Sequence, residues 1–319
     1  MMNMKLKITV LQFLFIVASL VGLNSCSHQS LKIARPLSKS NSTTPVSTLS
    51  FDYVNRLIRI EAGINNEEAS FDFILDTGAP TFVTNDVVEQ NNLWATEQQT
   101  AMDVNGNEQS LWRYNIQSLK IGGQSFKRVK ALSNTEVSDM AVLKNRANGG
   151  LIGADLMKNA IWKINYGCRE ITLSTSLDSL NIHDSIKPVK LYLDETGSPW
   201  IQAQIGDLPK LDFIVDLGYN GSVLLPEHLL AKPVFNDSLT QQEMLKLSTG
   251  FYSEDVQLTY KFIKTFKWGP HVWEDVKASS SGNNTKALLG NAFFENHVLV
   301  LDFIHHKLFL LPPDPSCSA

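Results

Sequence analysis

The sequence has few cysteines and a small net charge, and each of these features argues against particular classes of function. Only three cysteines occur in 319 residues, and none lies in a CxxC motif, so a thiolate zinc site has no support. The formal net charge of −4 gives no reason to expect a nucleic-acid partner, since nucleic-acid binding requires a basic face. HExxH, GxSxG, P-loop and dinucleotide-binding motifs are also missing. We therefore expect no metal, no cofactor and no nucleic-acid partner.

The N-terminus has the layout of a secretory signal. Two lysines precede an almost continuous apolar run over residues 8–23, and small polar residues then lead to Cys26. This ending resembles the lipobox of bacterial lipoproteins, which implies a signal peptide over 1–25 and a lipidated Cys26. The polar segment 26–50 reads as a flexible tether. A transmembrane anchor and an uncleaved signal are the alternatives.

The lipobox resemblance places the protein in the cell envelope, anchored to a bacterial membrane and facing the periplasm or the exterior. Acyl chains contribute about 0.8 kcal/mol per buried CH₂, so such an anchor needs no spanning helix. In some bacteria an acidic residue after the lipidated cysteine retains lipoproteins at the inner membrane. Ser27 stands at that position, which favours the outer membrane.

Three blocks of the sequence recur in the same order further along the chain. Each contains short apolar runs bounded by glycine, asparagine or proline, which is typical of strands rather than helices. The matched blocks are 71–78 with 211–218, 119–131 with 266–278, and 151–166 with 288–303. Duplication predicts an all-β chain with two tandem lobes, over residues 51–180 and 181–315. Brief helices are expected at 154–159 and 292–296.

Two cysteines remain after Cys26, and they lie towards the ends of the two lobes. They are Cys168 and Cys317. An export compartment is oxidising enough for a bridge between them, but two unpaired thiols are equally compatible with the sequence. His305 and His306 lie at an expected hairpin tip, where a solvated turn is the better interpretation than a metal site.

An aspartate follows an apolar strand in each lobe, at the start of a tight turn. The first lobe reads Asp-Thr-Gly at 76–78, and a Leu-Ile-Gly segment follows at 151–153. This pattern resembles the retropepsin-like and pepsin-like aspartic proteases, over nearly all of residues 50–312. The resemblance implies two acid-protease-like β-barrel lobes that form a pseudo-dimer, with Asp76 and Asp216 as the catalytic pair.

In that family the two aspartate loops meet at the interface between lobes. Carboxylates about 3 Å apart share one proton, so one can activate a water while the other binds the peptide carbonyl. The resemblance therefore implies a membrane-anchored endopeptidase acting on peptides or proteins. The chain is expected to be a monomer that carries the pseudo-dimer within itself.

Two predicted hairpin turns are candidates for flaps that close over a substrate. Asn105 and Gly106 form an Asn-Gly turn, a strong hairpin signal, about thirty residues after the first aspartate. Thr249 and Gly250 lie at a similar distance after the second aspartate. Closure of such a hairpin excludes water from the reacting bond.

The second active-site loop departs from the family pattern. Thr77 and Gly78 follow the first aspartate, whereas Leu217 and Gly218 follow the second. In the family a hydroxyl at this position joins the loops through reciprocal hydrogen bonds, which Leu217 cannot make. Two alternatives therefore stay open: a non-catalytic peptide-binding relative, and a protease that uses Asp76 in an intermolecular homodimer.

Overall fold

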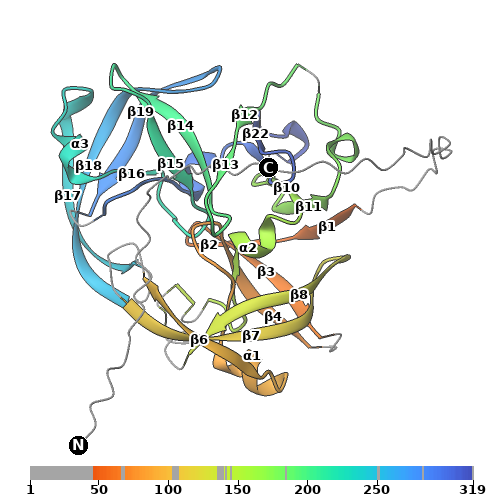
Figure 1. Ribbon diagram of the computed structural model, residues 1–319. Coiled ribbons are helices and arrows are strands. Elements are labelled where there is room, and N and C mark those ends of the chain that lie inside the picture. Colours follow the sequence, from red (N-terminus) through yellow and green to blue (C-terminus); the bar gives the residue numbers. More distant parts are fainter. Residues whose placement is uncertain are drawn as a thin grey trace, which may run out of the picture. The chain divides into compact units, whose positions relative to one another are not determined.

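The structure is a computed structural model. It describes residues 46–65, 69–102, 108–134, 140, 142–143, 146–183, 185–249, 252–281 and 284–317. Residues 43–319 form one compact unit. Most of the described residues lie in strands (Figure 1), which confirms the all-β prediction.

Six strands of the first lobe close into a ring. Their order is β3 (Leu57–Ile64), β4 (Ser70–Asp76), β9 (Gly150–Gly153), β5 (Phe82–Val83), β8 (Gln124–Ser133) and β7 (Glu108–Ile121). The ring closes because β3 pairs with β7 as well as with β4. Two outer strands, β2 (Asp52–Val54) and β6 (Ala95–Met102), extend the sheet beyond β3 and β7.

The second lobe repeats this order with its own strands. Its ring consists of β14 (Pro199–Ile205), β15 (Leu211–Val215), β20 (Ala287–Leu289), β16 (Val223–Leu224), β19 (His271–Ser280) and β18 (Tyr252–Trp268). The pairing of β14 with β18 closes it. The outer strands are β13 (Tyr192–Leu193) and β17 (Phe235–Thr249). Two closed β lobes are therefore present, as the sequence predicts.

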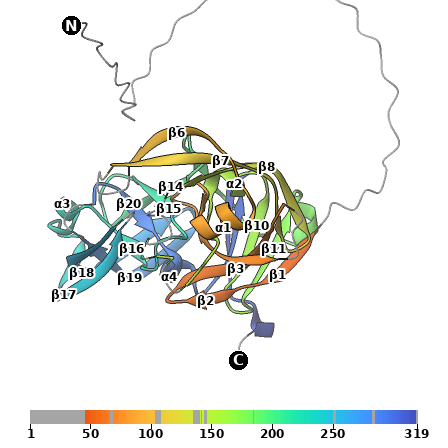
Figure 2. The ribbon, with the colours of Figure 1, turned by 90° about the horizontal axis from the view of Figure 1, so that it is seen from below.

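A third sheet contains strands from both halves of the chain. Its order is β1 (Ser47–Ser50), β11 (Glu170–Ser174), β10 (Ile161–Asn165), β21 (Val298–Asp302), β22 (Lys307–Leu311) and β12 (Val189–Lys190). The antiparallel pair β10–β21 joins the two halves by backbone hydrogen bonds. Figure 2 shows β1, β10 and β11 side by side, as in Figure 1.

The expected tether over 26–50 ends earlier than the sequence suggested. Ser47–Ser50 form β1, which pairs in register with β11, so that Leu49 lies opposite Ile171. Leu49 packs against the hydrophobic core. Burying this side chain favours an ordered strand over a solvated linker, since apolar burial contributes about 25 cal/mol per Å². The lobe boundaries at 180 and 181 stay a prediction.

The helices are short and lie where strands end. They are α1 (Asn85–Gln90), α2 (Ala154–Met157), α3 (Glu227–Leu230), α4 (Asn291–Phe294), and the 3₁₀ turns η2 (Leu177–Leu180) and η3 (Pro315–Cys317). The helices α2 and α4 confirm the two expected from the sequence. No helix among the described residues has the length and apolar character needed to cross a membrane.

The core forms because strands present alternate side chains to the inside of each ring. In β3, Ile58, Ile60, Ala62 and Ile64 are all buried. One continuous cluster of buried apolar residues includes both lobes and the strands of the shared sheet. This shared core fixes the strand ends that carry the two aspartates.

Candidate active site

The two aspartates occupy equivalent places at the ends of buried strands. Asp76 is the last residue of β4, next to Gly153 in the parallel strand β9. Asp216 follows β15, and its backbone N–H donates to the carbonyl of Leu289, 2.9 Å away, in the parallel strand β20. The Leu-Ile-Gly segment and its Leu-Leu-Gly counterpart therefore support the strands that deliver the aspartates.

The structure brings Asp76 and Asp216 together from separate lobes, so that the charge of one acts on the pKa of the other. Each glycine of the two loops faces the aspartate of the other loop. A Cβ on Gly78 would lie 2.8 Å from Cγ of Asp216, and one on Gly218 would lie still closer to Cγ of Asp76. Glycine is required at both positions because any side chain would collide with the opposite carboxyl group.

Each carboxyl group also accepts a hydrogen bond within its own loop. The Gly78 N–H donates to Oδ1 of Asp76 at 2.9 Å, and the Gly218 N–H donates to Oδ1 of Asp216 at 2.8 Å. The two loops thus have the same local geometry. This matching holds although Leu217 replaces the hydroxyl residue.

The electrostatics favour a pair that holds a proton. Burial raises the pKa of Asp76 well above its ordinary value, and repulsion from Asp216 raises it further, against the opposing effect of the Gly78 N–H. Burial also raises the pKa of Asp216, against opposing hydrogen bonds from Gly218 N–H and from Asp76. Both side chains remain partly accessible to solvent, so a water or a substrate can reach them. Such a pair can act as a general acid and a general base.

Thr77 alone provides the hydroxyl link between the loops. Its Oγ1 donates to the carbonyl of Val215 at 2.6 Å and accepts from the Leu217 N–H at 2.9 Å. Thr77 is fully buried. Leu217 is fully buried too and belongs to the hydrophobic core, so the second half of the reciprocal link is replaced by apolar packing.

A buried amide, Asn291, gives the second loop a support that sequence reasoning missed. Its Nδ2 donates to the carbonyl of Leu217 at 2.6 Å, and its Oδ1 accepts from the Tyr166 hydroxyl at 2.8 Å. Tyr166 belongs to the first half of the chain and Asn291 to the second. The repeat held no signal for this contact because Ala154 is the counterpart of Asn291.

Tyr219 stands where the first loop has the small Ala79. Its hydroxyl and Oγ of Ser279, in β19, form a hydrogen bond of 2.8 Å. Burial raises the pKa of this phenol to about 12. The ring is thus tied to the wall of its own lobe, and the Tyr219 N–H donates to the backbone carbonyl of Asp216 at 3.2 Å.

The expected flap hairpins can be followed up to their tips. β6 and β7 pair as far as Met102 and Glu108, and the tip with Asn105 and Gly106 lies outside the described residues. In the second lobe, Thr249 is the last residue of β17, opposite Tyr252. Gly250 lies outside the described part of the chain. Both hairpins occupy equivalent places in their lobes, but the flap assignments stay predictions.

Of the remaining candidate residues, some lie in the described part of the chain and one lies outside it. Cys26 lies outside the described residues. Cys168 and Cys317 form a disulfide. Together with Asp314 they make the one cluster of metal-ligand types within the described ranges, and its thiols are used in the bridge. His305 bonds to Asp302 at the turn before β22.

The comparison with known families agrees with this geometry. Residues 60–156 match the family model described as aspartyl protease. The match contains the first aspartate loop and the Leu-Ile-Gly strand beside it. No curated protein matches the chain. Residues 60–156, which hold the first aspartate loop, are therefore similar to an aspartyl protease domain.

Proposed function

We propose that the protein is an aspartic endopeptidase that hydrolyses peptide bonds with a water activated by Asp76 and Asp216. The observation that carries this proposal is the meeting of the two carboxyl groups, each facing the glycine of the other loop. The aspartyl protease domain supports the same chemistry. The raised pKa of both groups supports a shared proton.

The proposed reaction uses the two carboxyl groups in different protonation states. The ionised carboxylate takes a proton from the water, which attacks the peptide carbonyl carbon. The protonated carboxyl donates a hydrogen bond to the carbonyl oxygen and stabilises the tetrahedral intermediate. Proton transfer to the leaving amine then breaks the C–N bond. The groups exchange roles, and no covalent enzyme intermediate forms.

We further propose that the enzyme works as a lipid-anchored monomer in the cell envelope, on peptide or protein substrates. Cys26 and the preceding apolar run support the anchor. The compact unit over residues 43–319 supports a pair formed within one chain. The outer membrane remains the favoured location.

Substitution of the two aspartates tests the chemistry. We expect Asp76→Asn and Asp216→Asn each to reduce peptide hydrolysis by at least about a hundredfold, the usual contribution of acid–base catalysis. The measurement is cleavage of a diverse peptide mixture, followed by mass spectrometry, from acidic to neutral pH.

The chain offers matched controls for this experiment. Asp72 and Asp212 lie four residues before the catalytic candidates in the same two strands. Asp72 forms an ion pair with Arg59 and Asp212 is exposed, so Asp72→Asn and Asp212→Asn should keep most of the activity. Full activity of Asp216→Asn would refute the intrachain pair. Peptide binding without any cleavage by the unmodified protein would favour the non-catalytic relative instead.

A further inference from the structure

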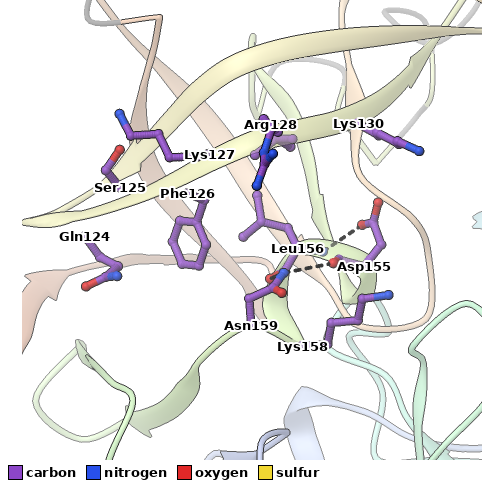
Figure 3. Close-up of a pocket in the computed structure, with 11 residues that line it drawn as sticks. Gln124, Ser125, Phe126, Lys127, Arg128, Lys130, Asp155, Leu156, Lys158 and Asn159 are labelled. Atoms are coloured by element: carbon purple, nitrogen blue, oxygen red, sulfur yellow. Dashed lines mark hydrogen bonds between the residues drawn. The ribbon is translucent and has the colours of Figure 1, made fainter.

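A basic cavity lies on the first lobe, and its lining does not include Asp76 or Asp216. It has a volume of about 540 Å³ and is lined by Gln124–Lys130 of β8 and by residues in and just after α2. Figure 3 shows three cations of β8 along one side and Lys158 on the other. Phe126 and Leu156 supply an apolar part of the lining. The cavity therefore combines cationic rims with an apolar floor.

Within the described part of the chain, the positive charge of this cavity exceeds the negative charge of its lining. The side chains of Lys127, Arg128, Lys130 and Lys158 are exposed. Among the described residues, none of the four forms an ion pair. Asp155 is the acidic residue of the lining, so the cations outnumber it.

The carboxyl group of Asp155 is also engaged elsewhere. Its Oδ1 accepts hydrogen bonds from the N–H of Thr81 at 2.8 Å and from the Thr81 hydroxyl at 2.7 Å. The Leu156 N–H donates to the same oxygen at 3.0 Å. This aspartate supports the loop after Asp76, and its single negative charge leaves the four cations in excess. An anion from outside the protein is therefore the natural partner of the cavity.

The second lobe shows that the fold does not require these cations. The counterparts of Lys127, Arg128 and Lys158 in the repeat are Glu274, Asp275 and Glu295. The backbone is the same at the central position, since φ is +54° at Arg128 and +52° at Asp275. Three of the four positions thus carry the opposite charge in the second lobe, whereas Lys130 has a lysine, Lys277, as its counterpart. The fold therefore does not require a cation at Lys127, Arg128 or Lys158.

The cavity adjoins the point where the N-terminal segment enters the fold. The Gly123 N–H, one residue before the lining begins, donates to Oγ of Ser47 at 2.6 Å. Ser47 is the first residue of β1. A chain anchored at Cys26 would reach the folded unit through the residues just before Ser47. A lipid anchor would therefore attach on this side of the folded unit, and the tether before Ser47 would allow the cavity to reach the membrane surface.

We propose that this cavity binds the phosphate-bearing headgroups of anionic lipids in the membrane that holds the protein. The proposal rests on the proposed lipid anchor and adds an orientation to it. Clustered Lys and Arg residues beside a membrane bind anionic headgroups, and each cation near the surface changes the affinity by a factor of about five.

Lysine labelling of the full-length, lipidated protein tests this orientation. The protein is inserted into vesicles of phosphatidylcholine alone or of phosphatidylcholine with phosphatidylglycerol, and an amine-reactive reagent is read out by mass spectrometry. We expect Lys127, Lys130 and Lys158 to react about fivefold more slowly in the anionic vesicles. This factor is the change in membrane affinity that a single cation near an anionic surface contributes. Lys210, exposed on the second lobe, should react at the same rate in both.

A charge-exchanged variant provides the matched comparison. Lys127→Glu, Arg128→Asp and Lys158→Glu together install the residues of the second lobe, and Lys130 should then lose its protection. The control variant Lys232→Glu, Lys264→Glu and Lys267→Glu makes the same change in charge on the second lobe. Lys130 should stay protected in it. Equal labelling of Lys130 in the two kinds of vesicle would overturn the proposal.

The remaining outcomes separate this proposal from its rivals. A flotation assay with neutral vesicles tests the anchor separately from the labelling. If the wild-type protein floats with these vesicles and Cys26→Ser does not, the anchor is supported. Protection by inorganic phosphate in neutral vesicles, with none added by phosphatidylglycerol, would make the cavity a soluble-phosphate site and overturn the lipid assignment. Protection in neutral vesicles that grows with protein density would assign the cavity to the acidic face of a second copy, and would also overturn it.

Discussion

A single hydroxyl group, that of Thr77, connects the active-site loops of the two lobes. It bonds to the carbonyl of Val215 and to the N–H of Leu217, and all three residues are buried. On the other side of the interface, Asn291 holds the carbonyl of Leu217. The second loop lacks its own hydroxyl, but the Leu217 backbone is held at its N–H by Thr77 and at its carbonyl by Asn291. Leucine at position 217 is therefore compatible with an ordered catalytic loop.

Replacing Thr77 should reveal how much this hydroxyl contributes. Thr77→Val keeps the shape but leaves a buried carbonyl and a buried N–H unpaired, which costs about 2–4 kcal/mol in the free energy of unfolding. Activity should fall with it, because the two carboxyl groups lose their alignment. Urea unfolding and peptide hydrolysis measure the two effects.

The conservative change Thr77→Ser is the control for this substitution. It keeps the hydroxyl and removes only a methyl group, so most of the activity should remain. Thr77→Val with wild-type stability and activity would show that the link between the loops is dispensable.

The raised pKa values of the two aspartates predict that the free energy of unfolding falls as the pH rises. The folded protein binds these protons more tightly than the unfolded chain does. The resulting stabilisation is complete below the ordinary pKa of 3.8 and is lost as the pH rises through the raised values. We expect Asp76→Asn, which does not ionise, to be more stable than wild type at neutral pH and to lose this advantage below about pH 4.

Urea midpoints measured across this pH range test the expectation. Asp212→Asn removes the same charge at an exposed position of the second lobe, and it controls for a general effect of net charge. An advantage of Asp76→Asn that is constant with pH would contradict a shared, tightly held proton.

At the scale of elements, the strand ends that carry the aspartates were predictable from sequence. Strands β4 and β15 are buried and bounded by glycine turns, so their composition alone identifies them. The hairpin β21–β22 was predictable for the same reason. The pairing of β10 with β21 was not, because backbone hydrogen bonds between two apolar strands require no particular side chains.

Other features were missed because they break the repeat. Asn291 supports the second loop, but the first lobe has Ala154 in its place. β1 lies in a polar segment whose composition is typical of a linker. Only its position beside β11 shows that it is a strand. Contacts that exist in one lobe only leave no periodic signal, and tertiary packing decides them.

The disulfide connects a turn of the shared sheet to the C-terminal 3₁₀ turn η3. Its reduction should lower the stability of the protein measurably. Cys168 lies in the turn between β10 and β11, and Cys317 lies in η3 near the C-terminus, 149 residues later. A bridge over such a long loop typically contributes about 2–4 kcal/mol. We expect a reducing agent to lower the urea midpoint accordingly.

The double variant Cys168→Ser, Cys317→Ser should unfold at the midpoint of the reduced protein and respond no further to the reducing agent. Thiol titration establishes that the bridge has been reduced. An unchanged midpoint after complete reduction would show that the bridge adds no stability.

At the scale of the whole molecule, the described fold places both aspartates in one compact unit with a continuous core. Each chain then contains a complete pair. Specific activity should be independent of protein concentration. A mixture of the Asp76→Asn and Asp216→Asn proteins should stay inactive, because neither chain has two intact carboxyl groups.

Recovery of activity in that mixture would show that pairs form between chains. It would support the intermolecular homodimer that the sequence left open. Wild-type protein diluted over the same concentration range is the reference, measured with the same peptide substrate.

The sheet shared by the two halves also has a consequence for biosynthesis. Strands β21 and β22, over residues 298–311, follow the strands of both rings along the chain, and β21 supplies the backbone pairing that joins the halves. A nascent chain still attached to the ribosome has its first aspartate but lacks the strand that brings the second one beside it. For the proposed endopeptidase, the pairing that joins the two halves around the catalytic pair therefore forms only after β21 has been synthesised.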